Sequence, residues 1–446
     1  MTPSRRLADF LAGLDGRVDD RLTGTAIDCL VDTLGAIVYG SRLPWSQSVI
    51  AHAAATGADG PCEIVGGTRT APAMAALANG ASAHGFELDD VHEEAISHPG
   101  AVVVPAALAL GQELDASGGE LLEAIVIGYE AMGRAGIAVG PASHMLGGFH
   151  PTSMSGVFGA AAAAGRLLGF DGEAMNHAFG IAASLASGTM EFAASGGMAK
   201  RLHAGRAAEG GLTAALLADR SFEGSSDGLA GEYGFCRVFT DDPHVDRLTD
   251  RLGERWMIDE ITVKPYPSCS DIHPMVQAAE ELRAEHALTP DRIAHIDAEG
   301  PTKAATQNSM DGTASVMAAQ YSAEFNIAAA ILTDPADPAT FDAGRITDDA
   351  IASLQAKVRS IRPHPDFDAT YAWKMGGRVR ITLTDGTVLE RTVHGQRGSM
   401  HAPLTRGDID AKFRLLTKDR WGADAIERIR SVRTLTARTL LPESAT

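Results

Sequence analysis

The hydrophobic pattern changes twice along this chain, and this change constrains the fold more than any single motif does. Up to about residue 258 apolar residues recur at helical spacing, and the same spacing returns after residue 397. The segment between them mixes helical patterns with strand-like alternation. We therefore expect a mostly α protein, in which residues 1–258 and 398–446 form one all-helical domain and residues 259–397 form a smaller, inserted α+β domain.

The individual elements follow from the same periodicity. The clearest strand signal is a hairpin whose two strands meet at Asp385-Gly386. Ser117 and Glu120 predict a capping box at the start of a long helix. The segment 140–156 is too rich in Gly, Pro and Ser to predict regular structure. The expected helices are two within 4–40, then 70–80, 117–139, 157–169, 173–188, from 205, 274–287, 316–333, 406–422 and 423–436; the expected strands are 292–301, 378–384 and 388–394.

Composition narrows the class of protein. The chain has 446 residues, of which 45% are hydrophobic and 21% charged, as expected for a soluble globular protein. Aromatic residues make up only 5%, while Gly and Ala are abundant, so we expect helices that approach one another closely. The formal net charge of −19 argues against a nucleic-acid partner, which would require a basic face. An acidic protein that binds an anion must concentrate its few cations, which directs attention to Lys200, Arg201, Arg206 and Lys264.

The cysteines and the N-terminal residues indicate the cellular compartment in which the protein is expected. The four cysteines form no CxxC pair, which indicates free thiols in a reducing environment. The first residues lack the apolar core of a signal peptide. No uninterrupted apolar run reaches the ~20 residues that a membrane span needs. The sequence therefore predicts a cytoplasmic protein without membrane contact.

The densest set of titratable residues lies in residues 79–110. Two histidines, His84 and His98, flank an acidic cluster, and the apolar run 101–110 that follows is typical of a buried segment. Carboxylates beside histidines suit proton transfer near neutral pH. His92-Glu93 opens like a zinc-protease motif, but the second histidine would have to stand at Ile96. We therefore expect no metal.

Two further patterns are rejected. The segment 224–228, GSSDG, matches the nucleophile elbow of serine hydrolases, but that motif requires a preceding strand, and a helical pattern precedes it here. No Walker loop and no GxGxxG element is present, which argues against a nucleotide cofactor.

Four motifs occur in a fixed order: HGFELDD with HPG, GFHPTSMSGVFGAAAAAGRLLGFD, MAKRLHAGRAA and VKPYPSCSDIHP. Together with DTLGAI near the N-terminus they resemble the MmgE/PrpD family over nearly the whole chain. The resemblance implies a helical domain built from both chain ends, an inserted α+β lid domain and a homodimer. It also implies chemistry next to a carboxylate of a small di- or tricarboxylic acid, without a redox cofactor and usually without a metal. The family's reactions include 2-methylcitrate dehydration, cis-aconitate decarboxylation and iminodisuccinate epimerisation.

The resemblance also implies the site residues. His98, His150, Lys200, His203 and Lys264 match active-site positions of the family. Two positions depart from it: Glu87 stands where decarboxylase-like members carry Asp, and Cys269 stands where decarboxylase and methylcitrate-type members carry His. The version KPYPSC is more similar to the epimerase-type and uncharacterised branches.

The residue types suggest a division of roles. We expect His150, Lys200, His98 and Asp90 to act in catalysis, with proton transfer at His150 and Lys200, although Asp90 could instead orient a histidine. The residues expected to bind substrate are His203, Lys264, Cys269, Asp89 and Glu87. Each has a plain alternative: a structural histidine, a solvated lysine or a small core filler. A hinge at Gly196-Gly197 would let the lid domain close over the site.

The expected reaction is cofactor-independent proton abstraction next to a carboxylate, most simply by a hydro-lyase. An epimerase of the iminodisuccinate type and a decarboxylase of the cis-aconitate type are alternatives. A catalytically silent homologue that binds a metabolite is the alternative from another class.

Overall fold

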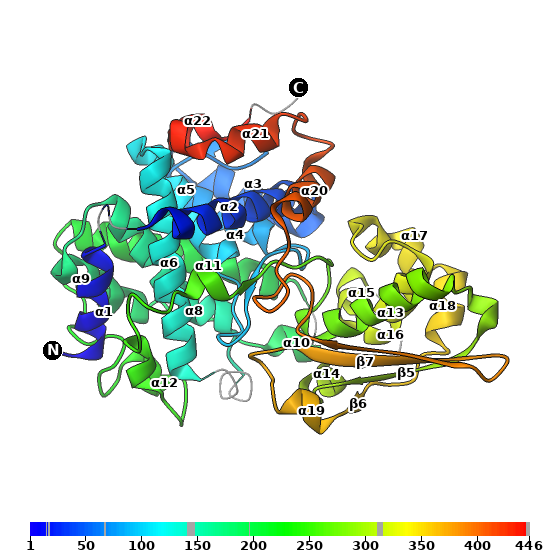
Figure 1. Ribbon diagram of the computed structural model, residues 1–446. Helices are drawn as coiled ribbons and strands as arrows, with labels where there is room; N and C mark the ends of the chain where they lie inside the picture. The colour runs from blue at the N-terminus through cyan, green and yellow to red at the C-terminus, as the bar shows by residue number, and fades with distance from the viewer. Residues whose placement is uncertain are drawn as a thin grey trace. The chain divides into compact units, whose positions relative to one another are not determined.

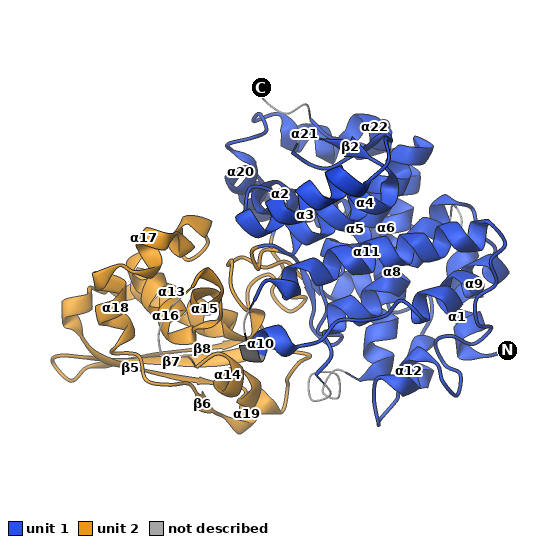
Figure 2. Cartoon of the chain, turned by 180° about the vertical axis from the view of Figure 1, so that it is seen from behind, with its two compact units in different colours: residues 1–85, 89–261, 405–446 blue, residues 86–88, 262–404 orange. Residues whose placement is uncertain are grey.

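The chain divides into two compact units in the computed structural model, coloured separately in Figure 2. Unit 1 contains residues 1–85, 89–261 and 405–446, and unit 2 contains residues 86–88 and 262–404. The expected domain boundaries were 258/259 and 397/398. That unit 2 acts as a lid stays a prediction. The described residues are 1–14, 16, 18–66, 68–140, 148–195, 197–309 and 315–442.

Unit 1 is mostly helical, as the periodicity predicts (Figure 1). Besides the helices it holds a two-stranded antiparallel sheet of β1 (Cys62–Glu63) and β2 (Arg69–Thr70). Its helices are α1 (Pro3–Ala12), α2 (Asp20–Gly40), α3 (Pro44–Thr56), α4 (Pro72–Ala83), α5 (Gly100–Leu114), α6 (Gly118–Val139), α8 (Pro151–Leu167), α9 (Gly172–Ala183), α10 (Glu191–Ser195), α11 (Ala199–Asp219), α12 (Phe235–Val238), α20 (Arg406–Thr417), α21 (Ala425–Arg430) and α22 (Ala437–Leu440).

The two ends of the chain meet in unit 1. Helix α2 packs against α20, and the Lys412 ammonium lies 2.7 Å from the buried carboxylate of Asp32. By length and composition α2 could cross a membrane, and it is the one such helix in the part of the chain that the structure describes. However, 72% of its most apolar window is buried inside the protein, as in a core helix.

Glycines let α4, α8 and α11 touch backbone to backbone. A Cβ atom at Gly205 of α11 would lie 2.2 Å from the carbonyl oxygen of Leu77 on α4. A Cβ atom at Gly211 would lie 2.3 Å from the carbonyl oxygen of Val157 on α8. Real Cβ atoms cannot approach so closely, so only glycine permits this packing. The small-residue composition thus has the structural consequence that we expected, and it fixes α11 between the two helices (Figure 1).

Several helix boundaries differ from the prediction, and two of the differences concern the site. Helix α8 begins at Pro151 and not at residue 157, because proline suits the first helical position and holds its predecessor His150 in the extended region. Helix α11 begins at Ala199, six residues before the expected start, so Lys200 lies in its first turn. At the C-terminus, α20 and α21 are both shorter than predicted.

Unit 2 has one four-stranded sheet in the order β6-β5-β7-β8. Strand β5 (Ile293–Gly300) pairs antiparallel with β7 (Gly376–Leu383) and parallel with β6 (Arg362–Pro363). The expected hairpin is confirmed: β7 pairs with β8 (Val388–His394), and Gly386 in the turn has a φ of 87°. The helices of unit 2 are α13 (His273–His286), α14 (Thr302–Gln307), α15 (Val316–Tyr321), α16 (Ala323–Leu332), α17 (Ala343–Ile346), α18 (Asp349–Gln355) and α19 (Pro365–Asp368).

Helix α13 packs on β7 and β8 and against α16, so it lies in the core of unit 2 (Figure 1). The single helix predicted over residues 316–333 is wrong. Ser322 ends α15 and also caps α16, because its hydroxyl accepts a hydrogen bond from the backbone N–H of Phe325.

Candidate active site

The titratable stretch of unit 1 lies between α4 and α5. Helix α4 ends at His84, and α5 begins at Gly100, immediately after His98 and Pro99. Asp89 and Asp90 between them are fully buried. The sequence predicted that the apolar run 101–110 would be buried, and this is confirmed, since α5 is buried from Gly100 to Gln112; that the run is a helix was not predicted.

The two histidines share one carboxylate. The Nδ1 atom of His84 lies 2.5 Å from Oδ2 of Asp89, and His98 Nδ1 lies 3.4 Å from the same oxygen. The His84 and His98 rings meet edge to face, with centroids 4.9 Å apart. The structure therefore places Asp89 as a partner of histidines, and its expected role in substrate binding stays a prediction.

Asp90 contacts His98 through its backbone. Its carbonyl oxygen lies 2.7 Å from His98 Nδ1, which leaves the Nε2 atom of His98 for other partners. The Asp90 carboxylate accepts hydrogen bonds from the Tyr129 hydroxyl at 2.7 Å and from the Gly100 N–H at 2.8 Å. Burial raises the pKa of this carboxyl to about 7, against the lowering effect of the Tyr129 hydrogen bond. Which of the two roles Asp90 has, catalysis or orientation of a histidine, stays a prediction.

His150 is placed by the loop before α8. It is the N-cap residue of that helix, and its N–H donates to the carbonyl oxygen of Gly188 at 3.0 Å. Its Nδ1 lies 3.0 Å from Nδ1 of His203, which projects from α11. Phe192 of α10 packs against both rings, with centroids 5.5 and 5.7 Å away. His84 completes the group, with its ring centroid 5.6 Å from that of His150.

Lys200 brings a positive charge to this histidine cluster. It is buried in the first turn of α11, where the helix dipole disfavours a cation. Burial lowers the pKa of His150 well below its usual range, and electrostatic interactions with His84, Lys200, His203 and His98 lower it further. Burial, with His84 and Lys200, lowers the pKa of His203 to about 4. Both imidazoles are therefore neutral near pH 7.

His84, Asp89 and His98 could in principle be metal ligands, because one ligand atom from each lies within 4.8 Å of the others. Two ligands bound at 2.0–2.2 Å to one tetrahedral ion stand roughly 3.3 Å apart. The Nδ1–Oδ2 separation of 2.5 Å between His84 and Asp89 is instead a hydrogen-bond distance. These side chains are arranged as a hydrogen-bonded network, and the absence of a metal cofactor remains an expectation.

The other expected site residues belong to unit 2. The Lys264 ammonium lies 3.1 Å from Oε2 of Glu87, and both side chains are buried. Burial raises the pKa of the Cys269 thiol to about 12, and its Sγ lies 3.9 Å from Oδ1 of Asn308. Lys264 thus forms a buried ion pair with Glu87. Cys269 is an uncharged thiol. Their roles in substrate binding stay predictions.

The sequence assigned no role to His84 or Phe192. His84 stands in the quoted motif HGFELDD, and a histidine five residues before a buried Asp is the signal that could have revealed the pair. Phe192 lies in a short helix with no periodic signal. Gly196, half of the expected hinge, lies outside the described residues.

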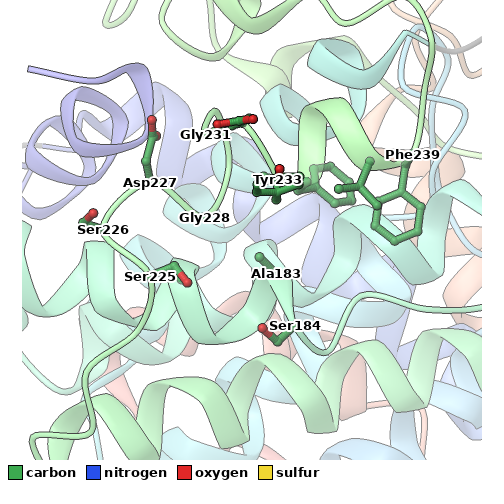
Figure 3. Close-up of a pocket in the computed structure, with 14 residues that line it drawn as sticks. Ala183, Ser184, Ser225, Ser226, Asp227, Gly228, Gly231, Tyr233 and Phe239 are labelled. Atoms are coloured by element: carbon green, nitrogen blue, oxygen red, sulfur yellow. The ribbon is translucent and has the colours of Figure 1, made fainter.

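A separate cavity of about 490 Å³ lies elsewhere in unit 1, around the segment 224–228. Ser225 and Ser226 lie on one side of it, and Tyr233 and Phe239 on another (Figure 3). The helix α11 precedes this segment. A nucleophile elbow requires a strand at that place, so the expectation that this segment is not one is consistent with the structure. None of the cluster around His150 is among the described residues that line this cavity.

Comparison with known proteins agrees with the family resemblance of the sequence motifs. A model of the MmgE/PrpD N-terminal domain matches residues 5–248, and a model of the MmgE/PrpD C-terminal domain matches residues 266–437. The chain is 29% identical over 413 residues to the cis-aconitate decarboxylase of Aspergillus terreus, which covers 87% of this chain and 83% of that protein. It is 28% identical over 431 residues to the cis-aconitate decarboxylase of Homo sapiens, with 93% and 87% covered.

Proposed function

Since this chain belongs to the MmgE/PrpD family, we propose that it is a lyase that acts next to a carboxylate of a small di- or tricarboxylic acid. The cis-aconitate decarboxylases to which it is similar are lyases, and they make a compound of this class the first substrate to test. The homodimer that the resemblance implies is part of the proposal. Light scattering of the purified chain tests it.

The observation that carries the proposal is the contact of His150 with His203 beside Lys200. A neutral imidazole can accept a proton from carbon, and the depressed pKa of His150 keeps it in that form near neutral pH. The negative charge that then develops on the substrate needs a nearby cation, and Lys200 is in place to supply one. A buried lysine in a position that the helix dipole disfavours is more typical of a functional site than of a structural role.

Two lyase reactions are compatible with these groups. In dehydration, His150 takes the proton from the carbon next to a carboxylate, and the hydroxyl on the neighbouring carbon leaves as water after Lys200 donates a proton to it. In decarboxylation, the bond to a carboxylate breaks, CO₂ leaves, and its electron pair remains on the carbon skeleton, which takes a proton from a protein donor. Dehydration was the first expectation from sequence, and the relatives' names favour decarboxylation.

Epimerisation is a second candidate because of Glu87 and Cys269. Both depart from the decarboxylase-like motif, and KPYPSC is similar to epimerase-type members. The buried pair of Glu87 and Lys264 adds to this, since a carboxylate already occupies the lysine. An epimerase would return the proton to the opposite face of the same carbon.

One experiment separates these reactions. The purified full-length protein is incubated in D₂O with cis-aconitate and a panel of hydroxy- and amino-dicarboxylates, and proton and carbon NMR follow the mixture. Loss of CO₂ indicates decarboxylation, loss or gain of water indicates hydro-lyase activity, and deuterium incorporation without either indicates epimerisation. If a folded protein yields none of these with any compound, the proposed function is wrong.

A further inference from the structure

We propose that His84 and Asp89 form a positioning pair that keeps His150 ready to accept a proton, an inference that rests on the proposed function. The pair is built into the end of α4 and the segment that follows it. Both side chains are only 1% exposed, and the Nδ1–Oδ2 distance of 2.5 Å makes their hydrogen bond short. The carboxylate holds the orientation of the imidazole ring.

His84 is not simply a satisfied core histidine. Its Nε2 atom is buried and has no hydrogen-bond partner among the described residues. Buried polar atoms are rarely left in this way, and those that are usually have a functional reason. The His84 ring lies 4.9 Å from that of His98 and 5.6 Å from that of His150, between centroids. His84 is thus placed next to the expected base.

The groups around His150 set the direction of the effect. His84 and His98 lie in the segment between α4 and α5, and Lys200 and His203 lie on α11. Helix α10 contributes the uncharged ring of Phe192. After burial, His84 is the largest cause of the lowered pKa of both His150 and His203. A neighbouring cation disfavours a second positive charge, so the paired His84 keeps the His150 lone pair free.

The pair also affects the second half of the reaction. When His150 accepts a proton from the carbon of the substrate, the electron pair of the broken C–H bond stays on the substrate, and His150 becomes positive. Its cationic neighbours then favour release of that proton from His150 and so return the base to its neutral form. His84 therefore acts through His150 and need not touch the substrate.

The test measures His150 directly and needs no substrate. Histidine-labelled full-length protein is titrated by NMR, with the His150 signals assigned by their loss in His150→Gln. In His84→Gln we expect the pKa of His150 to rise by about 1–3 pH units, the range for loss of a close charge. In Asp89→Asn we expect a smaller rise, because the charges of both partners disappear together. His177→Gln, on the half-buried face of α9, is the matched control and should change nothing.

The outcomes are distinct. An unchanged pKa of His150 in folded His84→Gln overturns the inference, whatever the activity. If His84→Gln fails to fold, Asp89→Asn decides, and a fall or no change of the His150 pKa there overturns it. Where a substrate is known, the acidic limb of kcat/KM should move to higher pH in His84→Gln. A uniform loss at every pH, without movement of the limb, would point to a structural role. Failure of the NMR panel with substrates contradicts the proposed function and leaves the His150 titration to be decided by itself.

Discussion

The Nδ1 atoms of His150 and His203 face each other at 3.0 Å, so one of the two nitrogens must donate and the other must accept. Both rings cannot be doubly protonated at this distance without repulsion between two cations. The contact therefore selects a neutral imidazole at the place where the proposed reaction requires a base. The predictions below follow from this contact and from the packing around it.

Replacement of His150 by Gln should lower kcat by roughly 10²–10⁴-fold, as is typical when a general acid or base is lost. Glutamine keeps a polar side chain at the N-cap but cannot accept a proton near neutral pH. Steady-state kinetics on the substrate found by NMR measure the loss. His177→Gln should retain full activity, and comparable losses in both variants would contradict the assignment of His150.

His203 should make the protein less stable in acid. Its pKa is about 4 in the folded protein, below the ordinary value of 6.5, so the unfolded chain binds more protons between these values. Stability is then complete above pH 6.5 and is lost as pH falls towards 4. Urea unfolding from pH 4 to 7.5 should give a flatter profile for His203→Gln than for the wild type. An equally steep profile in the variant would show that His203 does not carry this effect.

Asp90 should make the protein less stable as the pH rises, which is the opposite of the effect expected for His203. Its pKa is about 7 in the folded protein against an ordinary 3.8, so the folded state binds more protons between these values. Its contribution is complete below pH 3.8 and is lost as pH rises through 7. The loss should amount to a few kcal/mol at most, at about 1.4 kcal/mol per pKa unit. Asp90→Asn should remove this decline, as measured by urea unfolding between pH 5 and 8.

The buried pair of Lys264 and Glu87 should show strong coupling. Removing one partner deprives the other buried group of this counter-ion, which costs about 3–5 kcal/mol. Lys264→Met should therefore lower the stability of the protein by this amount, and the double variant Lys264→Met, Glu87→Gln should recover most of it. Denaturant unfolding of the two single variants and the double variant gives the coupling. Additive losses would mean that the two side chains do not pair in solution.

Replacement of two neighbouring glycines of α11 by alanine should have opposite effects on the stability of the protein. At Gly211 a Cβ atom would lie 2.3 Å from the carbonyl oxygen of Val157, so Gly211→Ala should destabilise by about 1–3 kcal/mol or more. At Gly210 the nearest atom is 3.6 Å away, so Gly210→Ala should be neutral or stabilise by up to about 1 kcal/mol. Thermal unfolding of both variants checks the contrast, and equal effects would contradict the observed packing of α11 on α8.

Elements whose signal is local could be predicted from the sequence. The capping box at Ser117 and the turn at Gly386 depend on neighbouring residues alone, and both occur as predicted. The change of hydrophobic period likewise predicted a helical part and a part with strands. Boundaries were less accurate where one residue decides them. Pro151 starts α8 early, and Ser322 divides a helix in two, because a single side chain can cap or begin a helix inside a favourable pattern.

The sequence alone determined which residue types could perform the chemistry and the order in which their motifs occur. Tertiary structure decided which of them meet. His84, His150 and His203 come from three distant segments. Packing of α4, α8 and α11 through glycine contacts places the His150 ring 5.6 Å from that of His84 and 5.0 Å from that of His203, between centroids. The same packing buries Asp89 against His84 and lowers the pKa of His150. Burial and the distance between charges set these properties, and neither is encoded in the spacing of residues along the chain.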